Sequence, residues 1–194
     1  MRPASAKRLT HWTLLAALLG ATLTGCGAGA EDTPGTPTTA QNAAGSTYPN
    51  TDEGAKALMQ ALGTGNDPTL VQQLKPTTAD YQAVFEGDVA AKAEQYYKAK
   101  LWNGSEVKIA AKPEQTDLKV FKATTEEIRS WSSAVAANFP GGYQQIGPHL
   151  KPGLTVYRWK YTEPGDDLGL AFEGLVNVNG RWVWVPKVWQ VLES

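Results

Sequence analysis

The sequence predicts an α+β domain in which N-terminal helices pack on one face of a curved antiparallel sheet. Three observations favour this fold class. Apolar residues in the first half of the chain after residue 51 recur at the spacing of amphipathic helices. The C-terminal third holds runs rich in valine, tyrosine and tryptophan, which are typical of strands. Asn179-Gly180 lies between two such runs, where this pair favours a two-residue hairpin turn.

Helices are predicted first along the chain. Asp52 and Asp67 are each positioned to cap a helix, and Gly63 is positioned to end the first one. Further helices are expected over residues 77–86 and 89–101, where apolar residues recur every three or four positions.

A helix inserted between strands is expected in the middle of the domain. Short strands are predicted over residues 106–110 and 118–123. Thr124 and Glu127 then have the spacing of a capping box, which predicts a helix as far as Phe139.

The remainder is predicted to be β structure. A short strand is expected over residues 143–146, followed by strands over 154–161, 168–178 and 181–185. Helices followed by a meander of strands give the element order of an α+β domain.

The predicted turn at Asn179-Gly180 fixes the register of the last two strands. It places Val178 opposite Arg181, Val176 opposite Val183, Leu175 opposite Trp184 and Glu173 opposite Pro186. One face then carries Leu168, Leu170, Phe172, Val176, Val178, Val183 and Val185 and is expected to pack on the helices. The other carries Glu173, Leu175, Trp182 and Trp184 among polar residues, so we expect it to be the functional surface.

The N-terminus has the features of an export signal. Residues 1–8 are basic, and residues 12–23 form an uncharged, largely apolar run that is shorter than the roughly 20 residues of a membrane-spanning helix. Leu23-Thr24-Gly25-Cys26 follows, and Cys26 is the only cysteine in the chain. This tetrapeptide resembles the lipobox of bacterial lipoproteins.

The lipobox resemblance implies cleavage between Gly25 and Cys26 and attachment of lipid to the Cys26 sulfur. The mature chain would then be held at a membrane outside the cytoplasm. Because Gly27 follows the cysteine, the resemblance implies the outer membrane, facing the periplasm, in a host with two membranes. Residues 26–50 are poor in large apolar side chains and predict a disordered tether to a single domain over 51–194.

Charge excludes one class of partner. Removal of residues 1–25 takes away three basic residues, which leaves 15 bases and 19 acids, a net charge of −4. A mildly acidic chain without basic clusters does not favour binding to nucleic acid.

The predicted element order is similar to that of NTF2-like and cystatin-like proteins, in which a curved sheet wraps a helix and leaves a pocket. The stretch from Gly169 to Trp189 also resembles uncharacterised bacterial lipoproteins, which implies no particular activity.

Two functions from different classes follow from the candidate residues. The favoured one is non-enzymatic binding of an envelope protein, peptide or glycan by an aromatic face, with Tyr157 and Trp159 continuing the surface of Trp182 and Trp184. The alternative is a small pocket enzyme in which His149 acts as a general base beside a carboxylate such as Glu173, which has no base predicted opposite it. No catalytic motif, metal site or cofactor is expected from the sequence.

Overall fold

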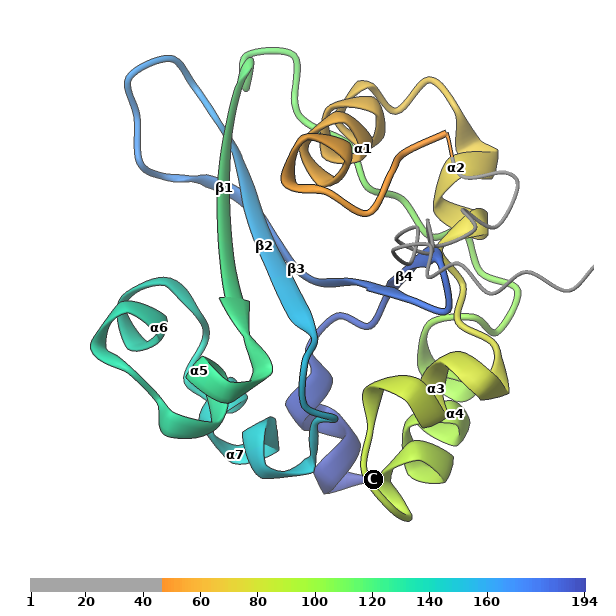
Figure 1. Cartoon of the computed structure of the whole chain (residues 1–194). Helices are drawn as coiled ribbons and strands as arrows, with labels where there is room; N and C mark the ends of the chain where they lie inside the picture. Colours follow the sequence, from red (N-terminus) through yellow and green to blue (C-terminus); the bar gives the residue numbers. More distant parts are fainter. Residues whose placement is uncertain (1–46) are drawn as a thin grey trace, which may run out of the picture. The chain divides into compact units, whose positions relative to one another are not determined.

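The computed structural model describes residues 47–194, and Figure 1 shows how the elements are arranged. The α-helices are α1 (Asp52–Thr64), α2 (Pro68–Gln73), α3 (Thr78–Val84), α4 (Val89–Lys100), α5 (Thr125–Ser130), α6 (Ser133–Asn138) and α7 (Gly142–Ile146). The strands are β1 (Asp117–Thr124), β2 (Thr155–Thr162), β3 (Gly169–Val178) and β4 (Arg181–Trp184), and the 3-10 helices are η1 (Gly147–His149) and η2 (Val188–Glu193). The α+β class is therefore confirmed.

The helix starts follow the predicted capping chemistry, with one shift. Asp67 caps α2 by accepting a hydrogen bond from the Thr69 amide, and Thr124 and Glu127 form the predicted capping box of α5. The cap of α1 is Thr51 rather than Asp52. The same helix ends at Gly65, which has a φ of 64°, and not at Gly63.

Three local predictions were wrong. Residues 106–110 form no strand; this segment runs beside α1 instead, where the Ala111 amide bonds the Gly63 carbonyl. Residues 143–146 lie in helix α7, because Tyr143 and Ile146 are buried together at helical spacing. The single helix expected from Thr124 to Phe139 is two helices, since Trp131 adopts a left-handed conformation with a φ of 50°.

The sheet is antiparallel, with the strand order β1-β2-β3-β4. Asn179 and Gly180 have φ values of 52° and 73°, which confirms the predicted turn with both central residues at positive φ. The predicted pairs from Val178–Arg181 to Leu175–Trp184 are also confirmed. Pairing of β3 with β4 stops there, so Glu173 and Pro186 are not strand partners.

A β-bulge at Gly174 divides β3 into two parts. Tyr157 pairs with Leu175 but Arg158 pairs with Glu173, so Gly174 is the extra residue. Its φ of 84° requires glycine, and a Cβ atom there would overlap the Val185 carbonyl.

The bulge exchanges the faces of β3. Even-numbered residues before Gly174 share a face with odd-numbered residues after it, and odd-numbered residues before it share the opposite face with even-numbered residues after it. We define the aromatic face by the side chains that this register brings together, namely Tyr157, Trp159, Tyr161, Phe172, Leu175, Trp182 and Trp184. Contacts between the rings agree, with Phe172 stacked on Trp159 at 5.4 Å and Tyr157 edge-on to Trp182 at 5.6 Å. The predicted face assignments of Leu170, Phe172 and Glu173 were therefore wrong, because the first two lie on the aromatic face and Glu173 on the opposite one. The continuity of Tyr157 and Trp159 with Trp182 and Trp184 is confirmed.

Helices contact both faces of the sheet, not one as predicted. On the aromatic face, the Tyr157 hydroxyl donates to Asp52 of α1, and the Tyr161 hydroxyl donates to the Met59 carbonyl of the same helix. On the opposite face, Val156 and Val176 surround a small void together with side chains of α3, α7 and η2. Figure 1 shows α5, α6 and α7 gathered at the end of the strands away from the loop that joins β2 to β3.

Asp80 joins the start of α3 to the hairpin turn. Its side chain is 1% exposed and accepts hydrogen bonds from the backbone and hydroxyl of Thr77, from Asn179 and from Arg181. Burial raises the pKa of Asp80, but these hydrogen bonds and the Arg181 charge outweigh it, so that the pKa is lowered overall.

The N-terminal end of the described chain is attached to the domain. Tyr48 is half-buried, and its carbonyl accepts a hydrogen bond from Trp182 Nε1 at 2.9 Å. Tyr48, assigned to the tether by the sequence, therefore lies against the fold. The predicted signal peptide, Cys26 and the rest of the tether lie outside the described residues. None of the helices in residues 47–194 combines the length and the apolar composition that a membrane span requires.

Candidate functional site

The aromatic face is part of the core and not an exposed binding surface. Tyr157, Trp159, Leu175, Trp182 and Trp184 are all between 0% and 6% exposed. The indole N–H of Trp182 donates a hydrogen bond to the Tyr48 carbonyl, and the indole N–H of Trp184 donates one to the Glu173 carbonyl. The prediction that these residues present an accessible platform was wrong, because α1, Tyr48 and Trp102 pack against this face.

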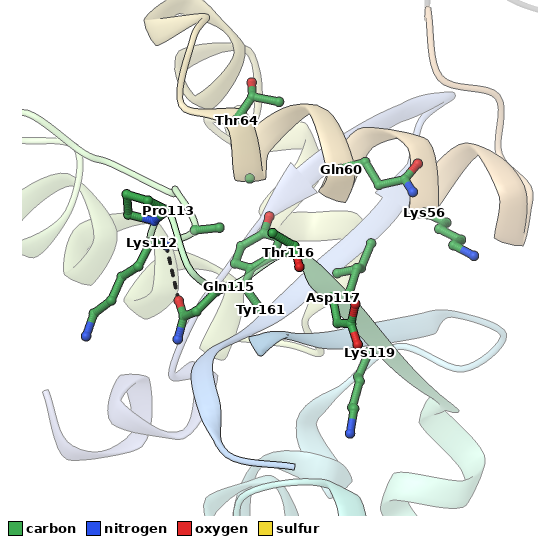
Figure 2. Close-up of a pocket in the computed structure, with 13 residues that line it drawn as sticks. Lys56, Gln60, Thr64, Lys112, Pro113, Gln115, Thr116, Asp117, Lys119 and Tyr161 are labelled. Atoms are coloured by element: carbon green, nitrogen blue, oxygen red, sulfur yellow. Dashed lines mark hydrogen bonds between the residues drawn. The ribbon is translucent and has the colours of Figure 1, made fainter. Parts of the chain in front are cut away.

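A wide polar groove of about 810 Å³ lies between α1 and the start of β1 (Figure 2). Its lysines are Lys56, Lys112 and Lys119, but Figure 2 shows their side chains pointing in different directions, away from the groove centre. Lys119 is bound to Asp167 at 2.5 Å. Because its cations do not converge, this groove lacks the few precisely aimed polar groups of a specific site.

A smaller cleft of about 370 Å³ lies where β3 extends beyond the end of β4, and we call it the edge cleft. This volume falls within the range of roughly 300–1,000 Å³ typical of ligand sites. Its walls come from the C-terminal part of α4, from β3, and from the end of β4 and the chain after it. The lining residues are Tyr96, Tyr97, Lys100, Leu101, Ala171, Phe172, Glu173, Trp184, Pro186, Lys187 and Gln190.

The edge cleft runs along the side of β3 rather than over a face of the sheet. Phe172 belongs to the aromatic face, whereas Ala171 and Glu173 belong to the opposite face, yet all three line the same cavity. Side chains of both faces can meet one cavity only at the edge of the strand. The other wall is the last turn of α4, where Tyr96 is held by a hydrogen bond to Gln190.

Glu173 is the buried acid of the edge cleft, 9% exposed. Burial raises its pKa, while the Lys187 amide, which donates to Oε1 at 3.1 Å, and the Arg158 and Lys187 charges oppose that rise. Arg158 lies directly opposite on β2, so the expectation of no base opposite Glu173 was wrong. The hairpin register concerns only β4 and the chain after it, whereas this base lies on β2.

Two buried phenols adjoin Glu173. Burial raises the pKa of Tyr97 and of Tyr143 well above the ordinary value, and the negative charge of Glu173 adds to both shifts. The Tyr97 hydroxyl donates to the Pro186 carbonyl at 2.8 Å, whereas the Tyr143 hydroxyl has no hydrogen-bond partner among residues 47–194. These phenols stay protonated at neutral pH, so neither serves as a base.

His149 does not belong to this site. It lies half-exposed on η1, where its backbone carbonyl accepts a hydrogen bond from the Glu86 amide. Glu173 is instead surrounded by Lys187, Arg158 and tyrosines, and no interaction in the described part of the chain joins it to His149. The structure therefore offers no support for the catalytic pair of the enzyme alternative. Within the same residues, no cluster of histidine, cysteine and acidic side chains could hold a metal ion.

Of the predicted binding residues, Glu173 and Trp184 line the edge cleft. Sequence reasoning missed the cleft's opposite wall, formed by Tyr96, Lys100 and Leu101 of the α4 region, because nothing in the sequence indicates which helix lies beside the edge. A usable signal was the length mismatch between the predicted strands, since 168–178 exceeds 181–185 by several residues.

Comparisons with protein-family models, with curated proteins and with solved structures found no match for this chain.

Proposed function

We propose that this protein is a lipoprotein of the bacterial envelope, anchored through lipid on Cys26, that binds a ligand non-enzymatically in the edge cleft. The anchor rests on the sequence pattern that ends at Cys26. Two or more acyl chains hold a protein stably at a bilayer, because each buried CH₂ contributes about 0.8 kcal/mol. The proposed location is the periplasmic side of the outer membrane in a host with two membranes.

The observation that carries the binding proposal is the composition of the edge cleft. Aromatic side chains from α4, β3 and β4 surround one buried carboxyl group, and Lys100 and Lys187 are exposed at its rim. Apolar walls with a few fixed polar groups suit a ligand that has both apolar and polar parts. The proposed binding site is therefore the edge cleft and not the aromatic face, and Glu173 and Trp184 are the predicted binding residues that line it.

We also assign the fold, as a finer proposal, to the NTF2-like or cystatin-like type. The support is that helices precede an antiparallel sheet and that α1 is hydrogen-bonded across the aromatic face through Tyr157 and Tyr161.

The binding proposal is tested by filling the cleft. Ala171→Trp places an indole in the cavity at an exposed position, and Ala99→Trp, on the exposed surface of α4, is the matched control. Thermal shifts of the full chain are measured against a library of glycans, peptides and small envelope metabolites. Ligands that stabilise the wild type and the control but not Ala171→Trp support the site. If every stabilising ligand acts equally on Ala171→Trp, the cleft is not the site.

The anchor has its own test. Mass spectrometry of the protein from its native host should find an N-terminus at Cys26 that carries diacylglycerol, and Cys26→Ser should release the protein from the membrane fraction. An unmodified thiol at Cys26 would refute the anchor without bearing on the cleft.

A further inference from the structure

We propose that the occupant of the edge cleft is an extended peptide segment of a partner protein, which adds to β3 as a fifth strand. This inference rests on the proposed function, because it names the ligand of the same cleft. It adds main-chain pairing as the means of recognition, with acidic and apolar side chains as the chemistry that the partner presents.

The backbone of β3 offers an unpaired edge at this position. Residues 169–173 pair with β2 on one side, whereas β4 pairs only with residues 175–178 on the other. The Glu173 carbonyl points to the unpaired side, because it accepts a hydrogen bond from Trp184 Nε1. Alternate residues of a strand direct their N–H and C=O groups to the same edge. The N–H and C=O of Ala171, two residues earlier, therefore point into the cleft, and Ala171 is exposed.

The gap beside Ala171 is built into the fold rather than left by a frayed strand. The Val185 amide bonds the Gly174 carbonyl, and the chain then turns away at Pro186, whose carbonyl is held by the Tyr97 hydroxyl at 2.8 Å. Lys187 follows with a φ of 50° and donates its amide to Glu173. These contacts fix the chain after β4, and a cavity of about 370 Å³ lies between β3 and α4.

The two edges of the sheet differ in how they are protected. β1, at the opposite edge, carries Lys119 and Lys122, and lysines on an edge strand discourage pairing with other chains. The stretch 169–172 of β3 has no charge and no proline. Leu168 just before this stretch and Leu170 within it are 78% and 36% exposed, and they are the exposed large apolar side chains of the described residues.

Charge selects the type of peptide. Lys100 and Lys187 are the exposed charged side chains of the cleft wall, while Glu173 is buried against the Lys187 amide opposite Arg158. A peptide with acidic residues at alternate positions would place them near these lysines. The intervening apolar residues would contact Leu170 or Phe172.

The probe is a phage-displayed library of random decapeptides, selected on the full chain in detergent. Enriched peptides should alternate apolar and acidic residues. Ala171→Pro removes the outward N–H and leaves the β2 ladder intact, because proline is tolerated on an edge strand whose N–H faces outward. It should weaken binding by about tenfold or more, whereas Ala171→Val, which keeps the N–H, should not.

Methylated peptides test the pairing without altering the protein. N-methylation at alternate residues of a selected peptide should abolish binding, and N-methylation at the intervening residues should leave it unchanged, because only alternate N–H groups face β3. The strand proposal is overturned by a selection that enriches no peptide, or by binding that survives both Ala171→Pro and every pattern of methylation.

Other occupants give distinct results. Self-association of the wild type that is lost in Ala171→Pro would identify a second copy, and enrichment of peptides that match residues 27–46 would identify the chain's own N-terminal segment. Either result overturns the partner peptide. If ligands from the thermal-shift library no longer bind Ala171→Trp but still bind Ala171→Pro, the cleft is supported as a binding site and the proposal of strand addition is refuted.

Discussion

Asp80→Ala should be among the most destabilising single changes in the domain. Asp80 is 1% exposed and accepts hydrogen bonds from Thr77, Asn179 and Arg181, the last at 2.7 Å. It thereby joins the first turn of α3 to the hairpin turn about a hundred residues later. Removing one partner of a buried pair leaves the other uncompensated and costs about 3–5 kcal/mol.

The structure places the Asp80→Ala cost near the lower end of that range. The Arg181 side chain is 36% exposed and retains hydrogen bonds to the carbonyls of Gln73 and Lys75, so water and backbone compensate part of the loss. About 3 kcal/mol in a domain of this size lowers the melting temperature by about 6–12 °C. Urea unfolding at pH 7 measures the free energy, and circular dichroism measures the melting temperature.

The Asp80 contribution should also depend on pH and on Arg181. Because the folded pKa of Asp80 is lowered, its stabilisation is present above the ordinary aspartate value of 3.8 and is lost as pH falls through the folded pKa. In an Arg181→Met background, Asp80→Ala should cost about 1–2 kcal/mol less. A cost below about 1 kcal/mol at pH 7, or one unchanged by Arg181→Met, would refute this reasoning.

Three further predictions concern stability. Burial raises the pKa of Glu173, so ionisation of this side chain destabilises the domain as pH rises from 4.5 through the raised pKa. In urea unfolding, the stability of Glu173→Gln relative to the wild type should therefore increase between pH 4.5 and 7.5. A difference that stays constant over this range would contradict the prediction. Gly63→Ala should destabilise the domain by about 1–2 kcal/mol, because a Cβ atom would lie 2.7 Å from the buried Tyr161 ring, although alanine favours helices. A higher melting temperature for this variant would show that the ring moves aside. Leu175, at 0% exposure, should lose about 2–5 kcal/mol of unfolding free energy on substitution by alanine, and Leu168, at 78% exposure, less than about 0.5 kcal/mol. Similar losses of unfolding free energy in the two variants would contradict the observed burial.

Features set by neighbouring residues were predictable from the sequence. The hairpin register followed from Asn179-Gly180, because two residues at positive φ fix the pairing of the strands beside them. The start of α5 followed from the reciprocal hydrogen bonds of Thr124 and Glu127. Each of these needs no knowledge of the rest of the fold.

Features set by distant residues were not predictable in the same way. Strict alternation along β3 places Phe172 on the wrong face, because it treats Gly174 as an ordinary strand residue. The bulge that breaks the alternation depends on pairing with β2 and on the close contact of Gly174 with Val185, which the sequence does not show. Glu173 seemed to lack a base opposite because β2, which carries Arg158, is joined to β3 by a loop that does not fix their register. The edge cleft depends on α4 packing beside β3, about 75 residues away in the sequence.

The bulge at Gly174 makes the length of this strand as constrained as its composition. If Gly174 paired with Arg158 as an ordinary strand residue, the outer half of β3 would turn over, so that Glu173 would lie opposite Trp159 and Phe172 would leave it. A one-residue insertion that a surface loop would absorb would here exchange core for surface along several residues at once. In related chains, the number of residues between the tryptophan that stacks on Phe172 and the asparagine of the hairpin turn should vary only within the loop that joins β2 to β3.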